Sequence, residues 1–171
     1  MQANGLPHKV PDWFGRLSSN KRILCLSPLA KSFSTSSSDR RPWLDPAIRP
    51  RLHAYLATLC RDCDCPAYRV GGATDHVHIA TRLARTLSQA ELLEKIKKTS
   101  SAWIKTQGEQ YGSFFWQGGY GDFFIGWSQL EELVRYIDRQ EQHHRTQTFQ
   151  EEYRHLLQKY HVEFDERYVW D

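Results

Sequence analysis

The sequence lacks the features that mark membrane, secreted and repeat proteins. No apolar run in the 171 residues approaches the roughly 18 needed to cross a bilayer. The opening residues include basic side chains but no apolar block followed by a small-residue cleavage site, so they do not predict a signal peptide. No internal repeat and no long linker is present. We therefore expect one compact domain without membrane association and, by default, a cytoplasmic location.

Cysteine is also scarce, with four residues in the whole chain. Cys60, Cys63 and Cys65 cluster, whereas Cys25 lies far from them. A structural zinc ion usually takes four ligands from paired spacings, and no second pair is present. Reduced thiols are therefore the favoured interpretation.

The net charge is small, +3 at pH 7, but it is unevenly distributed. Residues 1–61 carry ten Lys or Arg against three Asp or Glu, a net +7, and the remainder of the chain is net −4. A basic N-terminal part suits a polyanionic partner through counterion release. On charge alone, an ordinary solvated surface remains the simpler explanation.

What the sequence does contain is a succession of strand and helix patterns. Asp45 is typical of a helix N-cap, Pro46 of a first helical position, and apolar residues then recur at helical spacing. Capping boxes that predict further helices lie at 88–91, 128–131 and 148–151. Short strands are expected at 67–70, 76–81, 114–116 and 123–125. This order predicts an α+β fold in which helices cover one sheet.

Two histidines lie on one of these expected strands. Because side chains alternate along a strand, His76 and His78 share one face, while Val77 and Ile79 occupy the other. Neutral imidazole is a common metal ligand, and a sheet would hold the two rings rigidly. Asp75 could orient an imidazole from behind, or could be a turn residue. Two partly exposed strand histidines without a ligand are the alternative.

The helix expected after Ser128 carries a polar stripe beside its apolar face. Tyr136, Gln140 and His143 are spaced i, i+4 and i+7, so they stack along one edge. A phenol that attacks phosphorus forms a phosphotyrosine and releases a 3′ hydroxyl. The amide oxygen of Gln140 is a hard ligand suited to Mg²⁺ or Mn²⁺. The alternative is a half-buried aromatic residue with a surface glutamine beside it.

Five further residues are candidates for DNA contact. Exposed lysines on the helix that begins near Ser88 could track a phosphate backbone, and aromatic residues of the glycine-rich segment after it could stack on bases. These candidates are Lys95, Lys98, Lys105, Trp116 and Tyr120. A solvated helix face and ordinary core aromatics are the competing explanations.

Four motifs in order carry a family resemblance. These are D-H-V-H-I at 75–79, W-Q-G-G-Y-G-D-F at 116–123, Y-I-D-R-Q-E-Q-H-H at 136–144 and T-F-Q-E-E-Y at 148–153, and the closing F-D-E-R-Y-V-W-D agrees with them. Together they resemble the single-tyrosine HUH transposases, which include small insertion-sequence transposases and REP-associated tyrosine transposases. The resemblance runs from about Phe33 to Asp171.

The resemblance implies a fold, an activity and a set of roles. The fold would be a ferredoxin-like or RRM-like antiparallel sheet with helices on one face, plus a C-terminal helix carrying the nucleophilic tyrosine. His76, His78 and Gln140 would hold a divalent metal, Mg²⁺ or Mn²⁺, and Tyr136 would be the nucleophile. The protein would cleave and rejoin single-stranded DNA near hairpins through a 5′-phosphotyrosine intermediate. It would act as a homodimer, in some relatives with active sites shared between subunits.

The N-terminal part departs from this pattern. Phe33-Ser34-Thr35 matches the expected first strand, but the residues just before it form a poor strand pattern. We therefore divide the chain into an irregular, atypical segment at 1–32 and a single HUH transposase domain at 33–171. An incomplete sheet edge is the expected consequence.

Two other functions compete with the transposase. One is a domesticated or catalytically inactive module that binds single-stranded nucleic acid, and the other is a metal phosphoesterase that uses water as the nucleophile. Both would keep the histidine pair, but neither would form a covalent bond to Tyr136.

Overall fold

The computed structural model describes residues 30–37, 41–118 and 120–140. Within these ranges the elements follow one another in the order expected of an α+β domain, which confirms the predicted fold class. They are β1 (Ala30–Ser36), α1 (Arg49–Asp62), β2 (Ala67–Gly72), β3 (His76–Arg82), α2 (Gln89–Lys105), β4 (Gly121–Ile125) and α3 (Leu130–Asp138), with one-turn 3₁₀ helices at Glu109–Tyr111 and Trp127–Gln129. No helix in the described ranges is long and apolar enough to cross a membrane.

The four strands form one antiparallel sheet in the order β2-β3-β1-β4. β1 pairs with β3 from Ala30 opposite Arg82 to Ser36 opposite His76, and it pairs with β4 on its other side. The expectation of a poor first strand and an incomplete sheet edge is therefore wrong. An interior strand has main-chain partners on both sides, and this context outweighs a weak side-chain pattern.

The start of β1 bears on the division of the chain. β1 begins at Ala30, so it crosses the boundary that we drew between residues 32 and 33. Residues 1–29 lie outside the described ranges, as do residues 141–171, which include His143 and the capping box expected at 148–151. The division into an atypical segment and a single domain therefore stays a prediction.

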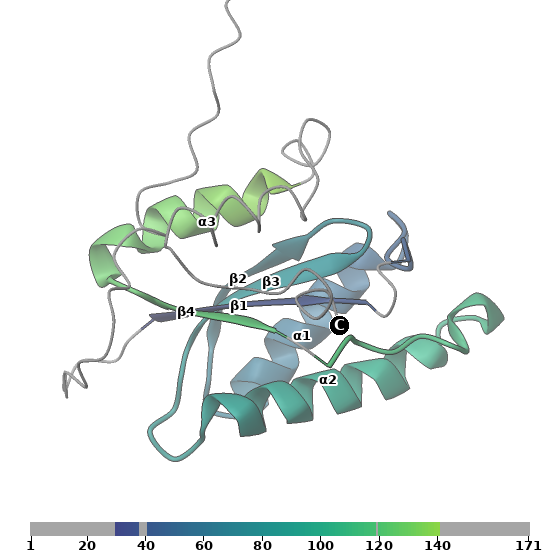
Figure 1. Cartoon of the computed structure of the whole chain (residues 1–171), viewed down its shortest axis with the longest axis horizontal. Coiled ribbons are helices and arrows are strands. Elements are labelled where there is room, and N and C mark those ends of the chain that lie inside the picture. Colours follow the sequence, from purple (N-terminus) through teal and green to yellow (C-terminus); the bar gives the residue numbers. More distant parts are fainter. Residues whose placement is uncertain (1–29, 38–40, 119, 141–171) are drawn as a thin grey trace, which may run out of the picture.

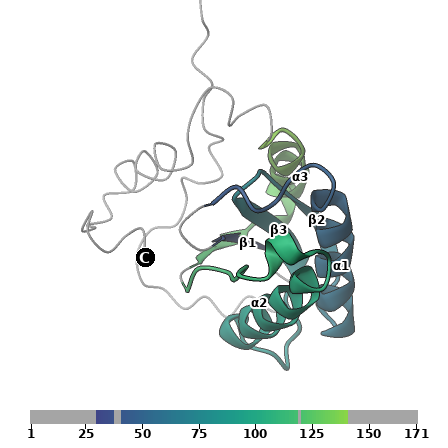
Figure 2. The same ribbon diagram turned by 90° about the vertical axis from the view of Figure 1, so that its right-hand side faces the viewer.

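The sheet is covered on both faces, but unequally. α1 and α2 lie on one face, and α3 lies across the other, as Figure 1 and the rotated view in Figure 2 show. The α1/α2 face holds a core of fifteen buried residues, which includes Leu52, Leu56, Val77, Ile79 and Phe114. The α3 face holds a small core of four, Ala80, Ile125, Leu133 and Ile137. Most of the apolar burial therefore lies on the α1/α2 face.

Local signals in the sequence fix where the first two long helices begin. The carboxylate of Asp45 accepts hydrogen bonds from the backbone N–H groups of Ala47 and Ile48, at 2.7 and 3.0 Å, so it caps a turn that leads into α1 at Arg49. At α2 the predicted capping box is present. The Glu91 N–H donates to Ser88 Oγ at 3.2 Å, and the Ser88 N–H donates to the Glu91 carboxylate at 2.8 Å.

Two local predictions are wrong. Residues 114–116 do not form a strand; they follow a 3₁₀ turn and make a single bridge, from Trp116 to Ser37. Their apolar pattern reflects the packing of Phe114 and Trp116 into the α1/α2 core. Ser128 does not cap α3, because it lies inside the 3₁₀ helix that precedes Leu130. A Gln129 side chain instead accepts a hydrogen bond from the Gly126 N–H at 3.2 Å.

Candidate catalytic and DNA-binding site

His76 and His78 both lie on the α3 face of β3. Val77 and Ile79 belong to the α1/α2 core, so alternation directs the histidines to the opposite side of the sheet. Their ring centroids are 5.0 Å apart. Both imidazoles are buried, His76 fully and His78 nearly so. The two rings are therefore core-facing polar groups rather than the partly exposed histidines of the alternative interpretation.

Small residues flank His78 on the neighbouring strands. Ser34 of β1 and Gly71 of β2 are its partners in the sheet register. A β-carbon built on Gly71 would lie 2.6 Å from Ile137 Cγ2 and 3.1 Å from the Ile137 carbonyl oxygen. Glycine at this position therefore allows α3 to approach the sheet closely. That close approach brings the end of α3 over the histidines.

Asp75 fixes the orientation of His76. Its carboxylate oxygen lies 2.7 Å from His76 Nδ1. A carboxylate only accepts, so Nδ1 donates, and in the neutral ring the lone pair resides on Nε2. His76 Nε2 lies 3.2 Å from Gln140 Oε1. A ring nitrogen held with its lone pair outward by a carboxylate is the arrangement that is typical of metal-ligating histidines.

α3 and the residues directly after it supply the other two side chains. Leu133 and Ile137 pack against the sheet, and Tyr136 is half-buried with its ring 5.6 Å from that of His78, at an interplanar angle of 73°. α3 ends at Asp138, one turn earlier than the stripe of residues predicted. Gln140 follows the turn at Arg139 and is fully buried beside His76. Sequence spacing thus grouped Tyr136 and Gln140 correctly, although α3 ends before Gln140.

The donor set fits a divalent cation. Two ligands at right angles on an ion, each roughly 2.1 Å from it, lie about 3 Å apart, and His76 Nε2 and Gln140 Oε1 are 3.2 Å apart. With Nδ1 as the donor to Asp75, both facing atoms are acceptors, and a cation between them would satisfy both. No cluster of three or more His, Cys, Asp or Glu suited to a metal occurs in the described ranges, where Gln140 Oε1 is the oxygen that faces His76 Nε2.

Of the five candidates for DNA contact, Lys98, Trp116 and Tyr120 line one groove beside α2, whereas Lys95 and Lys105 lie outside it. Lys95, Lys98 and Lys105 are exposed along α2, and Tyr120 is 45% exposed. Trp116 is placed in the core instead, because it is buried and its indole N–H donates to Ser100 Oγ at 2.8 Å. It does not present an open face on which a base could stack. Close packing and a satisfied indole N–H are the physical reasons.

Sequence reasoning missed two positions. Gly71 was not identified from the sequence as the point of contact with α3. Phe115, which is 55% exposed, was read as part of a strand. A signal for it existed, because in Phe114-Phe115-Trp116 the middle residue points away from its two buried neighbours.

The cysteines behave as expected in the part of the chain that the structure describes. Cys60, Cys63 and Cys65 are free thiols, and Cys25 lies outside the described ranges. Burial raises the pKa of the Cys60 thiol to about 12, with Cys65 and Cys63 adding to the effect. Cys60 is therefore protonated, and Cys60 and Cys65 belong to the core under α1 with Cys63 packed against it.

Solved structures share this fold. A protein from Deinococcus radiodurans R1, described as a candidate transposase, aligns with a TM-score of 0.54 at 13% identity, covering 72% of this chain and 98% of its own. A REP-associated tyrosine transposase bound to a REP hairpin aligns with a TM-score of 0.51 at 17% identity, covering 71% of this chain and 72% of its own. Comparison with curated proteins gives no match.

The family follows from the sequence match. Residues 33–140 match the family model described as IS200-like transposase. The chain belongs to the IS200-like transposase family. This confirms the family resemblance; the matched residues contain the first two motifs and the start of the third, and they end before the fourth.

Proposed function

We propose that this protein cleaves and rejoins single-stranded DNA through a 5′-phosphotyrosine on Tyr136, with a divalent metal, Mg²⁺ or Mn²⁺, held by His76, His78 and Gln140. One observation carries the proposal. Within a single chain, the ring of Tyr136 packs 5.6 Å from that of His78, and Gln140 Oε1 lies 3.2 Å from His76 Nε2. A nucleophile and a metal-ligand set thus share one side of one sheet.

The chain's own residues would divide the work. The Tyr136 hydroxyl oxygen forms a bond to phosphorus, the bond from phosphorus to O3′ breaks, and the phenol proton ends on the departing 3′ oxygen. The phosphodiester bond energy is retained, so the same step run backwards rejoins strands. His76, held by Asp75, and Gln140 would fix the position of the reacting phosphate. When bound, the cation supplies Lewis-acid stabilisation of charge on that phosphate.

The proposed substrate is single-stranded DNA beside a hairpin. One structural neighbour is a REP-associated tyrosine transposase described as bound to a REP hairpin. For the present chain, the family membership and the tyrosine beside paired histidines support the same substrate class. A duplex without a single-stranded flank would not reach a half-buried phenol as easily as a flexible strand.

Covalent capture tests the proposal. The full chain is incubated with Mn²⁺ and a labelled hairpin carrying single-stranded flanks, and the product is run on a denaturing gel. We expect a protein–DNA adduct that disappears in Tyr136→Phe and persists in Tyr68→Phe, a matched control because Tyr68 also packs in the small core under α3. Cleavage without an adduct would favour the phosphoesterase, and binding without cleavage would favour the inactive module.

Mixing two inactive variants tests the proposed homodimer with shared sites. Tyr136→Phe and His76→Ala are each inactive under the proposal, and their mixture regains activity only if one subunit's tyrosine reaches the other's histidines. The meeting of all four side chains within one chain favours a site built by a single subunit. We therefore expect a dimer, if it forms, to show no recovery of the adduct in this mixture.

A further inference from the structure

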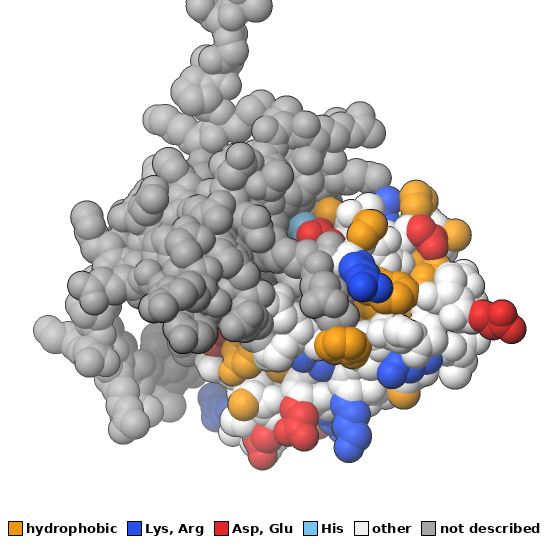
Figure 3. Space-filling view, turned by 45° about the vertical axis from the view of Figure 1, so that its right-hand side comes forward, with side chains coloured by type: hydrophobic (Ala, Val, Ile, Leu, Met, Phe, Trp, Pro, Cys, Tyr) orange, Lys and Arg blue, Asp and Glu red, His pale blue; other side chains and the backbone are white. Residues whose placement is uncertain are grey.

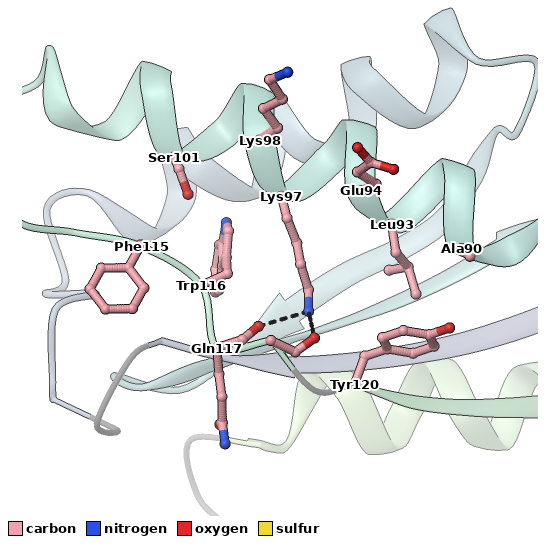
Figure 4. Close-up of a pocket in the computed structure, with 11 residues that line it drawn as sticks. Ala90, Leu93, Glu94, Lys97, Lys98, Ser101, Phe115, Trp116, Gln117 and Tyr120 are labelled. Atoms are coloured by element: carbon pink, nitrogen blue, oxygen red, sulfur yellow. Dashed lines mark hydrogen bonds between the residues drawn. The ribbon is translucent and has the colours of Figure 1, made fainter. Parts of the chain in front are cut away.

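A groove on the other side of the molecule is not used by the proposed chemistry. It has a volume of about 510 Å³ and lies between α2 and the segment that leads into β4 (Figure 4). Its principal side chains are Leu93, Lys97 and Lys98 from α2, and Phe115, Trp116 and Tyr120 from the segment. None of these residues contributes to the cluster around His76.

Lys97 ties the two walls of this groove together. Its ammonium group donates to the carbonyl oxygens of Gln117 and Gly118, at 2.9 and 3.2 Å, and lies 5.4 Å from the centre of the Tyr120 ring (Figure 4). Burial lowers the pKa of Lys97 to about 8, so this contact carries a desolvation cost. The segment is therefore clamped to α2 in one position, and Tyr120 is held with it.

Two of the three large hydrophobic side chains that are exposed in the described ranges border this groove. Phe115 is 55% exposed and Tyr120 is 45% exposed. Phe115 is anchored by its two neighbours, since Phe114 is fully buried and Trp116 is bonded to Ser100, and the Tyr120 ring is in contact with the Lys97 ammonium group. Exposed aromatic rings on a rigid support are surfaces on which unpaired bases can stack.

The charge around the groove suits a polyanion. α2 carries four lysines against two glutamates, and Lys95 and Lys98 are exposed. Glu94 also lines the groove and reduces its positive charge. Lys98 extends from α2 on the side away from the Gln117 carbonyl, so it can meet a phosphate only at the outer rim of the groove (Figure 4). Hydrophobic and basic side chains also lie side by side on the face shown in Figure 3. This mixture is typical of single-strand binding surfaces.

A residue that lines the groove is hydrogen-bonded to the sheet close to the histidines. The Gln117 N–H donates to the Ser36 carbonyl oxygen at 2.9 Å, and Ser36 is paired with His76. Neighbouring strands lie about 4.8 Å apart, so the floor of the groove is about 10 Å from the His76 backbone. A strand of a few nucleotides could reach from one to the other around the end of the sheet.

We propose that this groove binds the single-stranded flank of the DNA substrate, with Phe115 and Tyr120 as stacking surfaces and Lys98 as a phosphate contact. The inference rests on the proposed function for the identity of the strand. It differs from the sequence-based prediction in replacing Trp116 by Phe115 and in leaving Lys95 and Lys105 outside the binding surface.

Binding of a labelled oligothymidylate of about 12 nucleotides, a length within the range that single-strand binding folds cover, tests the proposal without any cleavage. Fluorescence anisotropy is measured with the full chain. Loss of one stacked base costs about 1–3 kcal/mol, so Phe115→Leu and Tyr120→Ala should each weaken binding about 5- to 150-fold. Tyr120→Phe keeps the ring and should bind within about twofold of the wild type. Lys98→Ala should reduce the salt slope of binding by about 1.

Matched controls decide the interpretation. Trp127 is 67% exposed but lies at the start of α3, and Lys105 is exposed on α2 beyond the groove, so Trp127→Ala and Lys105→Ala should have little effect. Wild-type affinity in Phe115→Leu and Tyr120→Ala would overturn the proposal. So would an altered assembly state by sedimentation with unchanged DNA affinity, which would assign the groove to protein contacts. Weakened binding with no adduct in the wild type would instead count against the proposed function alone.

Discussion

The two faces of the sheet differ in the side chains that they bury. The α1/α2 face buries fifteen residues, nearly all apolar, whereas the α3 face buries four apolar residues beside a polar cluster that contains His76, His78 and Gln140. Apolar burial is the main source of folding free energy, and buried polar groups cost free energy unless they are partnered. The α1/α2 face therefore provides most of the stability of the fold, and the α3 face holds the candidate site.

A single strand serves both faces. On β3, Val77 and Ile79 anchor the large core, and the alternating residues His76 and His78 carry the imidazoles on the other face. The backbone that positions the histidines is therefore held by the packing of the large core. A site built in this way should be easier to disrupt from the α3 side than from the α1/α2 side.

The largest effect should come from truncating a leucine in the large core. Leu52 and Leu133 are both fully buried, one on each face. Leu52→Ala should lower the free energy of unfolding by about 2–5 kcal/mol, the usual cost of a buried cavity. Leu133→Ala should instead loosen α3 locally, because Leu133 is one of the four buried residues of the small core that joins this helix to the sheet. Urea denaturation measures the loss of stability, and amide exchange measures where protection is lost. If Leu133→Ala reduced the protection of α1 and α2 as much as that of α3, the two faces would not differ in this way.

Moving α3 away from the sheet should disable the site and leave the large core intact. Gly71→Ala places a methyl group against Ile137, where overpacking costs about 1–3 kcal/mol. We expect weaker Mn²⁺ binding and less adduct. Gly118→Ala is the control, since an added β-carbon there meets no atom within 4 Å. Adding Ile137→Leu, which removes the clashing Cγ2, should restore part of the activity. If the double variant showed no recovery, contact with Ile137 would not be the cause of the loss.

How much of this could be predicted differs between the two faces. The period of two on β3 correctly separated the histidines from Val77 and Ile79, because alternation is a local property of any strand. The position of β1 in the middle of the sheet could not be predicted, since it depends on pairing with two distant strands. The burial of Trp116 and the exposure of Phe115 were missed for a similar reason. Which side of that segment faces α2 is decided by tertiary packing, with the Ser100 hydroxyl as partner.

The carboxylate behind His76 should have an intermediate effect, confined to the α3 face. Asp75→Ala removes the acceptor for His76 Nδ1, and loss of such a partner typically weakens metal binding about 10- to 100-fold. Asp75→Asn keeps an oxygen acceptor, so its affinity for Mn²⁺ should lie between those of Asp75→Ala and the wild type. Calorimetric titration with Mn²⁺ measures the affinities. If Asp75→Ala bound Mn²⁺ as tightly as the wild type, Asp75 would have no positioning role.

The smallest effect should be a pH dependence that arises on the α1/α2 side. Burial of His53, together with Arg49 and Arg69 nearby, lowers its pKa to about 4, whereas an unfolded histidine titrates near 6.5. The folded state therefore favours the neutral ring. The contribution of His53 to the free energy of unfolding is complete above about pH 6.5 and is lost as the pH falls towards 4. His53→Gln should lose less stability than the wild type between pH 6.5 and 4.5, and the two should keep a constant difference above pH 7. Because His53 is only partly buried, solvent screening keeps this difference small. Urea denaturation at each pH measures both proteins. If their free energies of unfolding differed by the same amount across the whole pH range, His53 would not cause the pH dependence.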